Sequence, residues 1–314
     1  MNKYAVSLTR CNTYSPDEIS QCLKRHFELL GGISQFIKSG DKVLLKPNLI
    51  APKPRGCATQ TDPQVIIELA KMLKDYGAKP FVGDSPAWAN VYSCVKKLEL
   101  DEPLKKLDVP VKQLNHPRTC VLAGGLKVGI SSIALDSDVI INLPKFKSHQ
   151  QLVATFAVKN MFGCVSGKAK ALWHFKKGGS EKHFCRLLID VYSLLKPALT
   201  IIDGVIAMDG PGPINGRARR LGWLIAGTEP IAMETVCARI INREPEEFPI
   251  IKTARQSGLG CIDEQQIQIV GDNYKNAVCL DFERAKIIPI RFSLLRVCKS
   301  TIKQLLILLK LRKT

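Results

Sequence analysis

The sequence lacks the motifs that mark common metal and cofactor sites. Its 11 cysteines form no Cys-x-x-Cys pair, so the spacing predicts neither a cysteine-built zinc site nor an intrinsic iron–sulfur cluster. No His-x-x-x-His spacing, no Gly-x-Gly-x-x-Gly fingerprint and no Walker-type phosphate loop is present. We therefore expect no metal ligands and no NAD or ATP bound in the usual ways, and the sequence leaves the cofactor unknown.

Long apolar segments are also lacking. The N-terminal MNKYAVSLTR has no apolar signal-peptide core. The uninterrupted apolar run Leu305–Leu309 is far shorter than the roughly 20 residues that span a bilayer. The chain is therefore expected to stay in the cytoplasm, where disulfides are not expected and most cysteines serve as small buried apolar residues.

Two segments of the chain contain almost no acidic residues. Their lysines and arginines account for most of the formal net charge of +18. From Arg284 to the C-terminus there are nine Lys or Arg and no Asp or Glu, which contributes +9. From Lys145 to Arg186, nine Lys or Arg face the single Glu181, which contributes +8. Only one positive charge is left for the rest of the chain, so the two basic segments need separate explanations.

The remaining sequence alternates strand and helix patterns. Helices begin at capping residues, such as the box formed by Ser15 and Glu18, and at Asp62. This alternation predicts an α/β fold, with a mostly parallel or mixed sheet and helices on both faces. Without an internal repeat or linker, residues 1–288 are expected to form a single domain, followed by a basic amphipathic tail at 289–314. The predicted strands are Tyr4–Leu8, Lys42–Leu45, Phe81–Val82, Val111–Leu114, Leu126–Leu135, Val139–Leu143, Thr200–Ile202, Trp223–Ile225 and Ile267–Val270, and the predicted helices run to Leu30 and Tyr76 and over Asn90–Leu100, Ser180–Leu195 and Ile231–Ile241.

Polar residues follow four of the predicted strands. Lys46-Pro47-Asn48, Gly83-Asp84-Ser85-Pro86, Asn142-Leu143-Pro144-Lys145 and Asp203-Gly204 each come directly after an apolar run. In open α/β sheets, ligands bind outside the carboxyl ends of the strands. We therefore predict a cleft for an anion at this edge. The predicted substrate-binding residues are Lys46, Asn48, Ser85, Asn142, Lys145, Lys147, Lys159 and Asn160.

Two histidines lie among these lysines. Nearby cations disfavour imidazolium, so His149 and His174 are candidate proton acceptors. Asp84 and Asp209 are further catalytic candidates that would orient a base or a cation. Simpler interpretations stay open, because Gly83–Pro86 has the composition of a turn and the Gly/Pro-rich segment after Asp209 that of a rigid loop.

Several of these motifs together resemble the domain-of-unknown-function 362 family. The resemblance covers roughly Tyr4 to Val270 and is carried by Lys46–Asn48, Gly83–Pro86, Asn142–His149, Lys159–Gly163 and Asp203–Pro213. Many members carry a ferredoxin-like iron–sulfur module, which implies redox chemistry. This chain has no cysteine cluster, so the resemblance implies an external electron donor such as a separate ferredoxin. A distant likeness to lactate-racemase-type proteins, which share Lys/His-rich sites, is an analogy only.

The second basic segment is the tail at 289–314. Apolar residues recur at helical spacing from Phe292 to Leu309, with Arg296 and Lys303 between them. A basic amphipathic helix without acidic residues is typical of peripheral association with an anionic membrane surface. The alternative is a terminal helix docked on the domain with its cations in solvent.

Three functions follow from these patterns. The first is an enzyme acting on a carboxylate or phosphate in the lysine-rich cleft, as an oxidoreductase or a proton-transfer enzyme. The second is a non-catalytic protein that binds such a ligand at the membrane surface. The third is RNA binding, which the high charge would suit. The basic core segment matches no nucleic-acid module, so the third is disfavoured.

Overall fold

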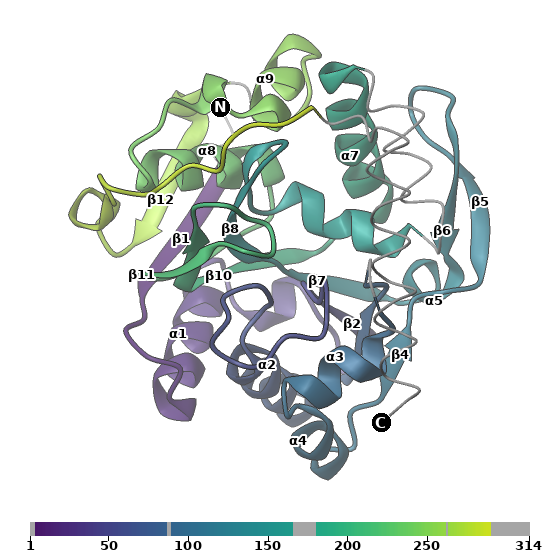
Figure 1. The fold of residues 1–314 in the computed structure, drawn as a ribbon. Helices are drawn as coiled ribbons and strands as arrows, with labels where there is room; N and C mark the ends of the chain where they lie inside the picture. The colour runs from purple at the N-terminus through teal and green to yellow at the C-terminus, as the bar shows by residue number, and fades with distance from the viewer. Residues whose placement is uncertain (1–3, 87–88, 166–179, 262, 290–314) are drawn as a thin grey trace, which may run out of the picture.

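The computed structural model describes residues 4–86, 89–165, 180–261 and 263–289, and its centre is one ten-stranded sheet (Figure 1). Eight strands follow one another in the order β12-β1-β11-β10-β7-β2-β3-β4, while β8 pairs with β10 and β9. The strands of this sheet are β1 (Tyr4–Arg10), β2 (Lys42–Pro47), β3 (Lys79–Asp84), β4 (Val111–Gln113), β7 (Val139–Leu143), β8 (Lys145–His149), β9 (Val153–Thr155), β10 (Leu199–Asp209), β11 (Arg217–Gly227) and β12 (Ile267–Gly271).

Parallel pairing dominates the sheet. All neighbouring pairs from β10 to β4 are parallel, as are β12 with β1 and β8 with β10. Only β11 on the main path runs antiparallel to its neighbours, β1 and β10. The predicted mostly parallel or mixed α/β sheet is therefore confirmed. Because β2, β3 and β7 point the same way, their carboxyl ends meet at one edge.

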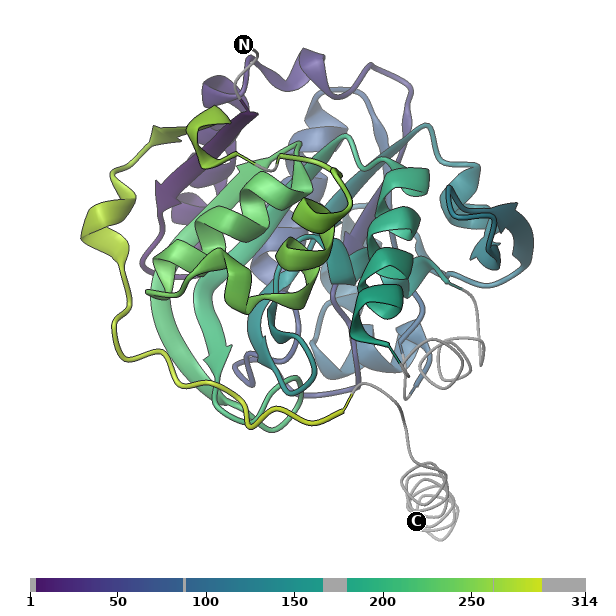
Figure 2. The same cartoon turned by 90° about the horizontal axis from the view of Figure 1, so that it is seen from above.

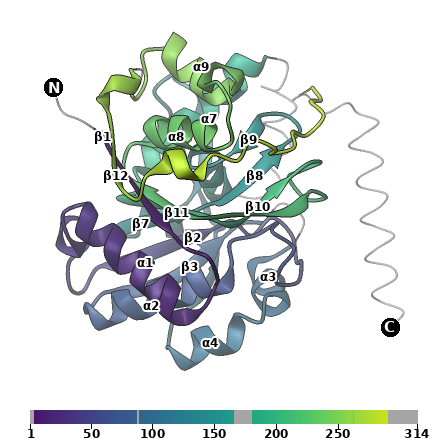
Figure 3. The same ribbon diagram turned by 90° about the vertical axis from the view of Figure 1, so that its left-hand side faces the viewer.

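Helices cover both faces of the sheet, as predicted (Figure 3). One face carries α1 (Pro16–Leu29), α2 (Pro63–Asp75), α3 (Val91–Lys97) and α4 (Asp101–Lys106). The other carries α7 (Glu181–Leu195), α8 (Pro230–Ile240) and α9 (Pro249–Gln256), which lie in front of the sheet in Figure 2. The smaller elements are α5 (Ser132–Leu135), the pair β5 (Pro117–Val121) and β6 (Lys127–Ser131), and the 3-10 helices η1 (Ile33–Gln35), η2 (Val158–Cys164), η3 (Pro245–Glu247), η4 (Glu264–Gln266) and η5 (Tyr274–Ala277).

Side chains that alternate along the strands form two hydrophobic cores. On β7, Ile140 belongs to the core beneath α7–α9, and Ile141 belongs to the core beneath α1–α3. Leu44 and Leu45 of β2 divide in the same way. Full burial of each such side chain contributes about 1.5–3 kcal/mol. The two cores hold the central strands rigidly and fix where their carboxyl ends lie.

Caps define where α1 and α2 begin. Ser15 Oγ accepts a hydrogen bond from the Glu18 N–H, and the Asp62 carboxylate accepts one from the Gln64 N–H. Both caps are confirmed. The predicted capping box is wrong in one detail, because the Glu18 carboxylate accepts the N–H groups of Asn12 and Thr13 instead of that of Ser15. Glu18 thereby fixes the loop between β1 and α1.

Four predicted elements differ in extent from the structure. The predicted helix Asn90–Leu100 ends at Lys97 because Glu99 adopts a positive φ of 56°, and α4 follows. The predicted strand Leu126–Leu135 divides into β6 and α5. The predicted strand at Thr200–Ile202 continues through an irregularity after Gly204 to Asp209, so Asp203 lies within β10, not at a strand exit. Lys145–His149, expected as part of a polar loop, is strand β8.

Two predicted features lie outside the described residues. These are His174, within residues 166–179, and the tail helix from residue 290 onward. Among the helices that the structure describes, none is long and apolar enough to cross a membrane.

Candidate functional site

The predicted convergence of strand ends is present in the structure. Side chains from β2, β3, β7, β8 and η2 are joined there by hydrogen bonds and one ion pair. Residues distant in sequence meet, since Asn48 bonds to both Lys147 and Asn160. We call these side chains, together with Lys159 next to Asn160 on η2, the strand-end cluster. Its bonded members are Lys46, Asn48, Asp84, Asn142, Lys147 and Asn160.

One ion pair in the strand-end cluster is fully buried. Lys46 Nζ lies 2.7 Å from Asp84 Oδ1 and also donates to the Pro47 carbonyl at 2.8 Å. The other Asp84 oxygen accepts the N–H of Leu49. Gly163 covers the pair, since a Cβ there would approach both Lys46 Nζ and Asp84 Oδ1 to 2.6 Å. The charges of Lys46 and Asp84 therefore compensate each other inside the protein, and neither charge is in contact with bulk solvent.

Three asparagines connect the strand ends to η2. Asn160 Nδ2 donates to Asn142 Oδ1 at 2.8 Å and to the Lys46 carbonyl at 2.9 Å. Its Oδ1 accepts from Asn48 Nδ2 at 2.8 Å. Asn142 in turn donates to the Ala157 carbonyl. A connected amide network of this kind fixes side-chain positions, because each broken bond leaves a buried polar group unpaired. It fixes the position of Asn48, whose Oδ1 accepts from the Lys147 amine.

Lys147 is buried with neutral partners only. Its Nζ donates to Asn48 Oδ1 at 2.6 Å and to the Thr59 carbonyl at 3.1 Å, and it forms no ion pair among the described residues. Burial lowers the pKa of the Lys147 amine well below its usual value, and the charge of Lys159 lowers that pKa further. The negative charge of Asp84 raises the pKa of Lys147, but this effect is smaller than the lowering by burial and by Lys159. Lys147 thus lies in surroundings that disfavour its charged form.

Lys159 is half-buried and has no hydrogen-bond or ion-pair partner within the part of the chain that the structure describes. Desolvation lowers the pKa of its amine to about 8. It lies in the first turn of η2, directly before the network residue Asn160. Lys147 and Lys159 are therefore the two lysines of the cluster without a carboxylate partner among the described residues.

A neighbouring group surrounds Lys145. Its Nζ lies 2.8 Å from Asp203 Oδ2 and 2.8 Å from the Tyr14 hydroxyl, which donates to Asp203 Oδ1. Burial and then Asp203 raise the pKa of Tyr14 well above its usual value. No sequence pattern singles out Tyr14, which lies 131 residues from Lys145 and directly before the Ser15 cap of α1. Lys145 is thus already paired, unlike Lys147 two residues further along β8.

The other predicted site residues occupy varied surroundings. His149 is buried at the end of β8, and its Nδ1 accepts the Gln151 N–H, which leaves Nε2 to carry the proton of a neutral ring. Ser85 is buried next to Asp84. Asp209 is not hydrogen-bonded to the cluster; its carboxylate accepts from Arg219 Nε at 2.9 Å. His174 lies outside the described residues.

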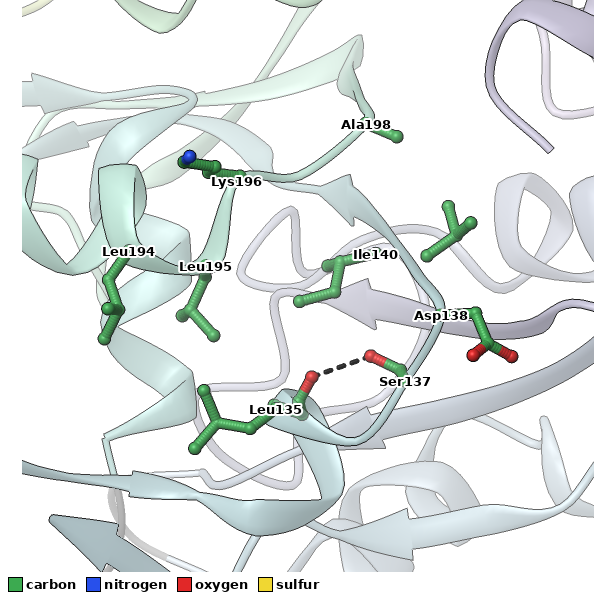
Figure 4. A pocket seen from close by; sticks show the side chains of 10 residues that line it. Leu135, Ser137, Asp138, Ile140, Leu194, Leu195, Lys196 and Ala198 are labelled. Carbon is green, nitrogen blue, oxygen red and sulfur yellow. Dashed lines mark hydrogen bonds between the residues drawn. The ribbon is translucent and has the colours of Figure 1, made fainter. Parts of the chain in front are cut away.

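Two cavities lie elsewhere on the described molecule. One of about 140 Å³ is at the amino end of β7, between Ser137, Ile140 and Lys196, as Figure 4 shows. The other, of about 470 Å³, lies between α3, α4 and β4 around Tyr92 and Leu104. Neither is lined by residues of the strand-end cluster, so the cleft predicted there stays a prediction.

Comparison with known proteins places the chain in a family. The sequence profile described as "Domain of unknown function (DUF362)" matches residues 43–239. The chain belongs to the DUF362 family. The matched region contains every residue of the strand-end cluster. A DUF362 relative, "Thylakoid-associated protein sll1697" of Synechocystis sp., is 35% identical over 307 residues, which cover 95% of this chain and 94% of the relative.

Two solved structures have a distant likeness to this DUF362 protein. The lactate racemase apoprotein of Thermoanaerobacterium thermosaccharolyticum gives a TM-score of 0.49 at 12% identity and covers 76% of this chain. A protein of Thermotoga maritima gives 0.41 at 14% identity and covers 64%. The chain spans 57% and 52% of the length of these two proteins. Both likenesses are too distant to bear on activity.

We searched the described residues for side chains that could bind a metal ion together. No group of three or more His, Cys, Asp or Glu side chains is placed there to hold an ion.

Proposed function

We propose that this DUF362 protein binds a small anionic molecule, a carboxylate or a phosphate, at the strand-end cluster. The observation that supports this most is the charge balance around β8. Lys46 and Lys145 each have an aspartate partner, whereas Lys147 and Lys159 have none among the described residues. Uncompensated buried charge is costly, and an anion beside Lys159, whose amine is charged below about pH 8, would offset that cost.

An enzyme is favoured over a non-catalytic binding protein. Holding an anion requires charged lysines, but Lys147 is kept in an environment that disfavours its charge. Strongly shifted lysines of this type serve as bases or nucleophiles. RNA binding is disfavoured because Lys46, Lys145 and Lys147 are buried, whereas phosphate-backbone contacts need exposed cations.

Anion binding is expected to weaken as pH rises through about 8. Lys159 has a pKa of about 8, so it is charged below this pH and loses its attraction for an anion above it. Titration calorimetry with inorganic phosphate and with L-lactate, at pH 6.5 to 9.5, measures the affinity. We expect Lys159→Met to weaken binding about tenfold or more and to remove the pH dependence, while Lys105→Met on the exposed surface of α4 leaves both unchanged. Affinity that is independent of pH and of Lys159 would contradict the proposal.

We also propose peripheral membrane association through the basic tail. The relative's name describes that protein as thylakoid-associated. In this chain, Arg284 to Thr314 carries nine Lys or Arg and no acidic residue, and each basic residue near an anionic surface contributes about 1 kcal/mol. The full chain is expected to float with vesicles containing anionic lipid and not with neutral ones. Replacing Arg291, Arg296, Lys299 and Lys303 with glutamine should release it. Equal flotation of this variant would contradict the role of the tail.

A further inference from the structure

The bonding of Lys147 matches a neutral amine. Its Nζ has two acceptors among the described residues, Asn48 Oδ1 at 2.6 Å and the Thr59 carbonyl at 3.1 Å, and both are uncharged. An amine has two hydrogens, which these two oxygens accept, and one lone pair. An ammonium has a third hydrogen, for which no described acceptor exists. The two oxygens therefore accept both hydrogens of a neutral amine and leave its lone pair without a described donor, whereas an ammonium would keep one hydrogen without a described acceptor.

The surrounding charges act in the same direction. Lys159, Lys145 and Lys46 all disfavour a further positive charge on Lys147, and Asp84 alone opposes them. Asp84 is itself bound to Lys46 at 2.7 Å. A lysine that is desolvated beside another cation is a common form of activated amine nucleophile.

Lys145 provides a comparison on the same strand. It is equally buried, two residues before Lys147, and therefore on the same face of β8. Asp203 and Tyr14 both lie 2.8 Å from its Nζ, so its positive charge is compensated. The contrast between two neighbouring buried lysines, one paired with a carboxylate and one with neutral oxygens, assigns them different roles.

We propose that Lys147 is a nucleophile that forms an imine with a small oxo acid, whose carboxylate is held by Lys159. This inference rests on the proposed function and names the substrate class of that same site. An oxo acid suits both lysines, because it carries an anionic group for the half-buried cation and a carbonyl carbon for the buried amine.

The covalent step balances without a further reactant. The Nζ lone pair attacks the carbonyl carbon, the carbonyl oxygen gains a proton, and a carbinolamine forms. Loss of that oxygen as water, with both hydrogens of the amine, gives the carbon–nitrogen double bond. No electrons are transferred, so neither an oxidant nor a reductant takes part.

Reductive trapping tests the assignment. The full chain is incubated at pH 7 with substoichiometric glyoxylate, the smallest oxo acid, and with cyanoborohydride, which reduces the imine to a stable secondary amine. Peptide mass spectrometry then compares the rate of labelling at Lys147 with that at exposed Lys105. At pH 7, each unit by which an amine's pKa falls below about 10.4 raises its neutral fraction about tenfold, so we expect Lys147 to react at least about tenfold faster than Lys105. Lys159→Met should slow labelling about tenfold, and Lys147→Met should abolish the fast phase.

The possible outcomes distinguish the proposed imine at Lys147 from the proposed binding of an anion. Labelling that is faster at Lys147 than at every other lysine, Lys159 included, supports the inference. Labelling that is uniform over exposed lysines, or fastest at Lys159, overturns it. If phosphate and lactate bind with the expected pH dependence but glyoxylate is not trapped, the imine is wrong and the proposed function stands. If none of these anions binds and no residue is trapped, both are wrong.

Discussion

Lys46→Met is expected to lower the free energy of unfolding by about 3–5 kcal/mol, because it leaves the Asp84 carboxylate buried without its counter-charge. The ion pair is 2.7 Å long and both side chains are almost completely buried. The Leu49 and Ser85 N–H groups would still bond to Asp84, but they carry no full positive charge. Urea unfolding at pH 7, followed by circular dichroism, measures the loss.

Lys147→Met is the matched control for this prediction. The same side chain is replaced at similar burial, but what remains unpaired is a pair of neutral oxygens instead of a carboxylate, so we expect a smaller loss of about 1–3 kcal/mol. The double variant Lys46→Met/Asp84→Asn removes both charges and should recover a large part of the stability. Equal losses for Lys46→Met and Lys147→Met would show that the ion pair is not the dominant interaction.

Much of the fold could be predicted because its signals are local. Caps at Ser15 and Asp62, and apolar runs such as Val139–Leu143, depend on residues a few positions apart. β8 could not be found in this way. Its alternating pattern places lysines where apolar residues are expected, and those lysines are buried only because Asp203 and Asn48, distant in sequence, accept their hydrogens.

The site could be predicted as a location but not as a set of pairings. Proximity of Lys46, Asn48, Asp84, Asn142 and Lys147 follows from the general rule that ligands bind at the carboxyl ends of parallel strands. Which lysine has an aspartate partner does not follow from any spacing. The difference between paired and unpaired lysines, on which the proposed chemistry depends, therefore emerges only from three-dimensional structure.

Glu234 is a buried acid that the sequence did not single out. It lies on α8 with no exposed surface, and its Oε1 accepts the Val158 N–H at 2.9 Å, at the start of η2. Its Oε2 is buried without a hydrogen-bond partner among the described residues. Burial raises the pKa of this carboxyl to about 8. Glu234 thus holds the segment that carries Lys159 and Asn160, and it does so mostly as a neutral acid at pH 7.

The stability of the wild-type protein is therefore expected to fall between about pH 4.5 and pH 8, relative to Glu234→Gln. In that window the folded state keeps a proton that the unfolded state releases, so stability present at low pH is lost as pH rises through the folded-state pKa. A rise of the pKa from 4.5 to about 8 corresponds to a differential loss on the order of 5 kcal/mol across the window.

Denaturant unfolding of wild type and Glu234→Gln at half-unit steps from pH 4.5 to 9 measures this difference. Glutamine keeps the acceptor for Val158 but does not ionise, so any constant cost of its amide group cancels in the slope. Glu102→Gln, at an exposed position on α4, serves as the control and should follow the wild-type curve. A wild-type curve parallel to that of Glu234→Gln would mean that the carboxyl titrates normally, and that water or a partner group reaches Oε2. We expect instead that the free energy of unfolding of the wild type falls relative to that of Glu234→Gln as pH rises. This result would show that the protonated acid holds the start of η2.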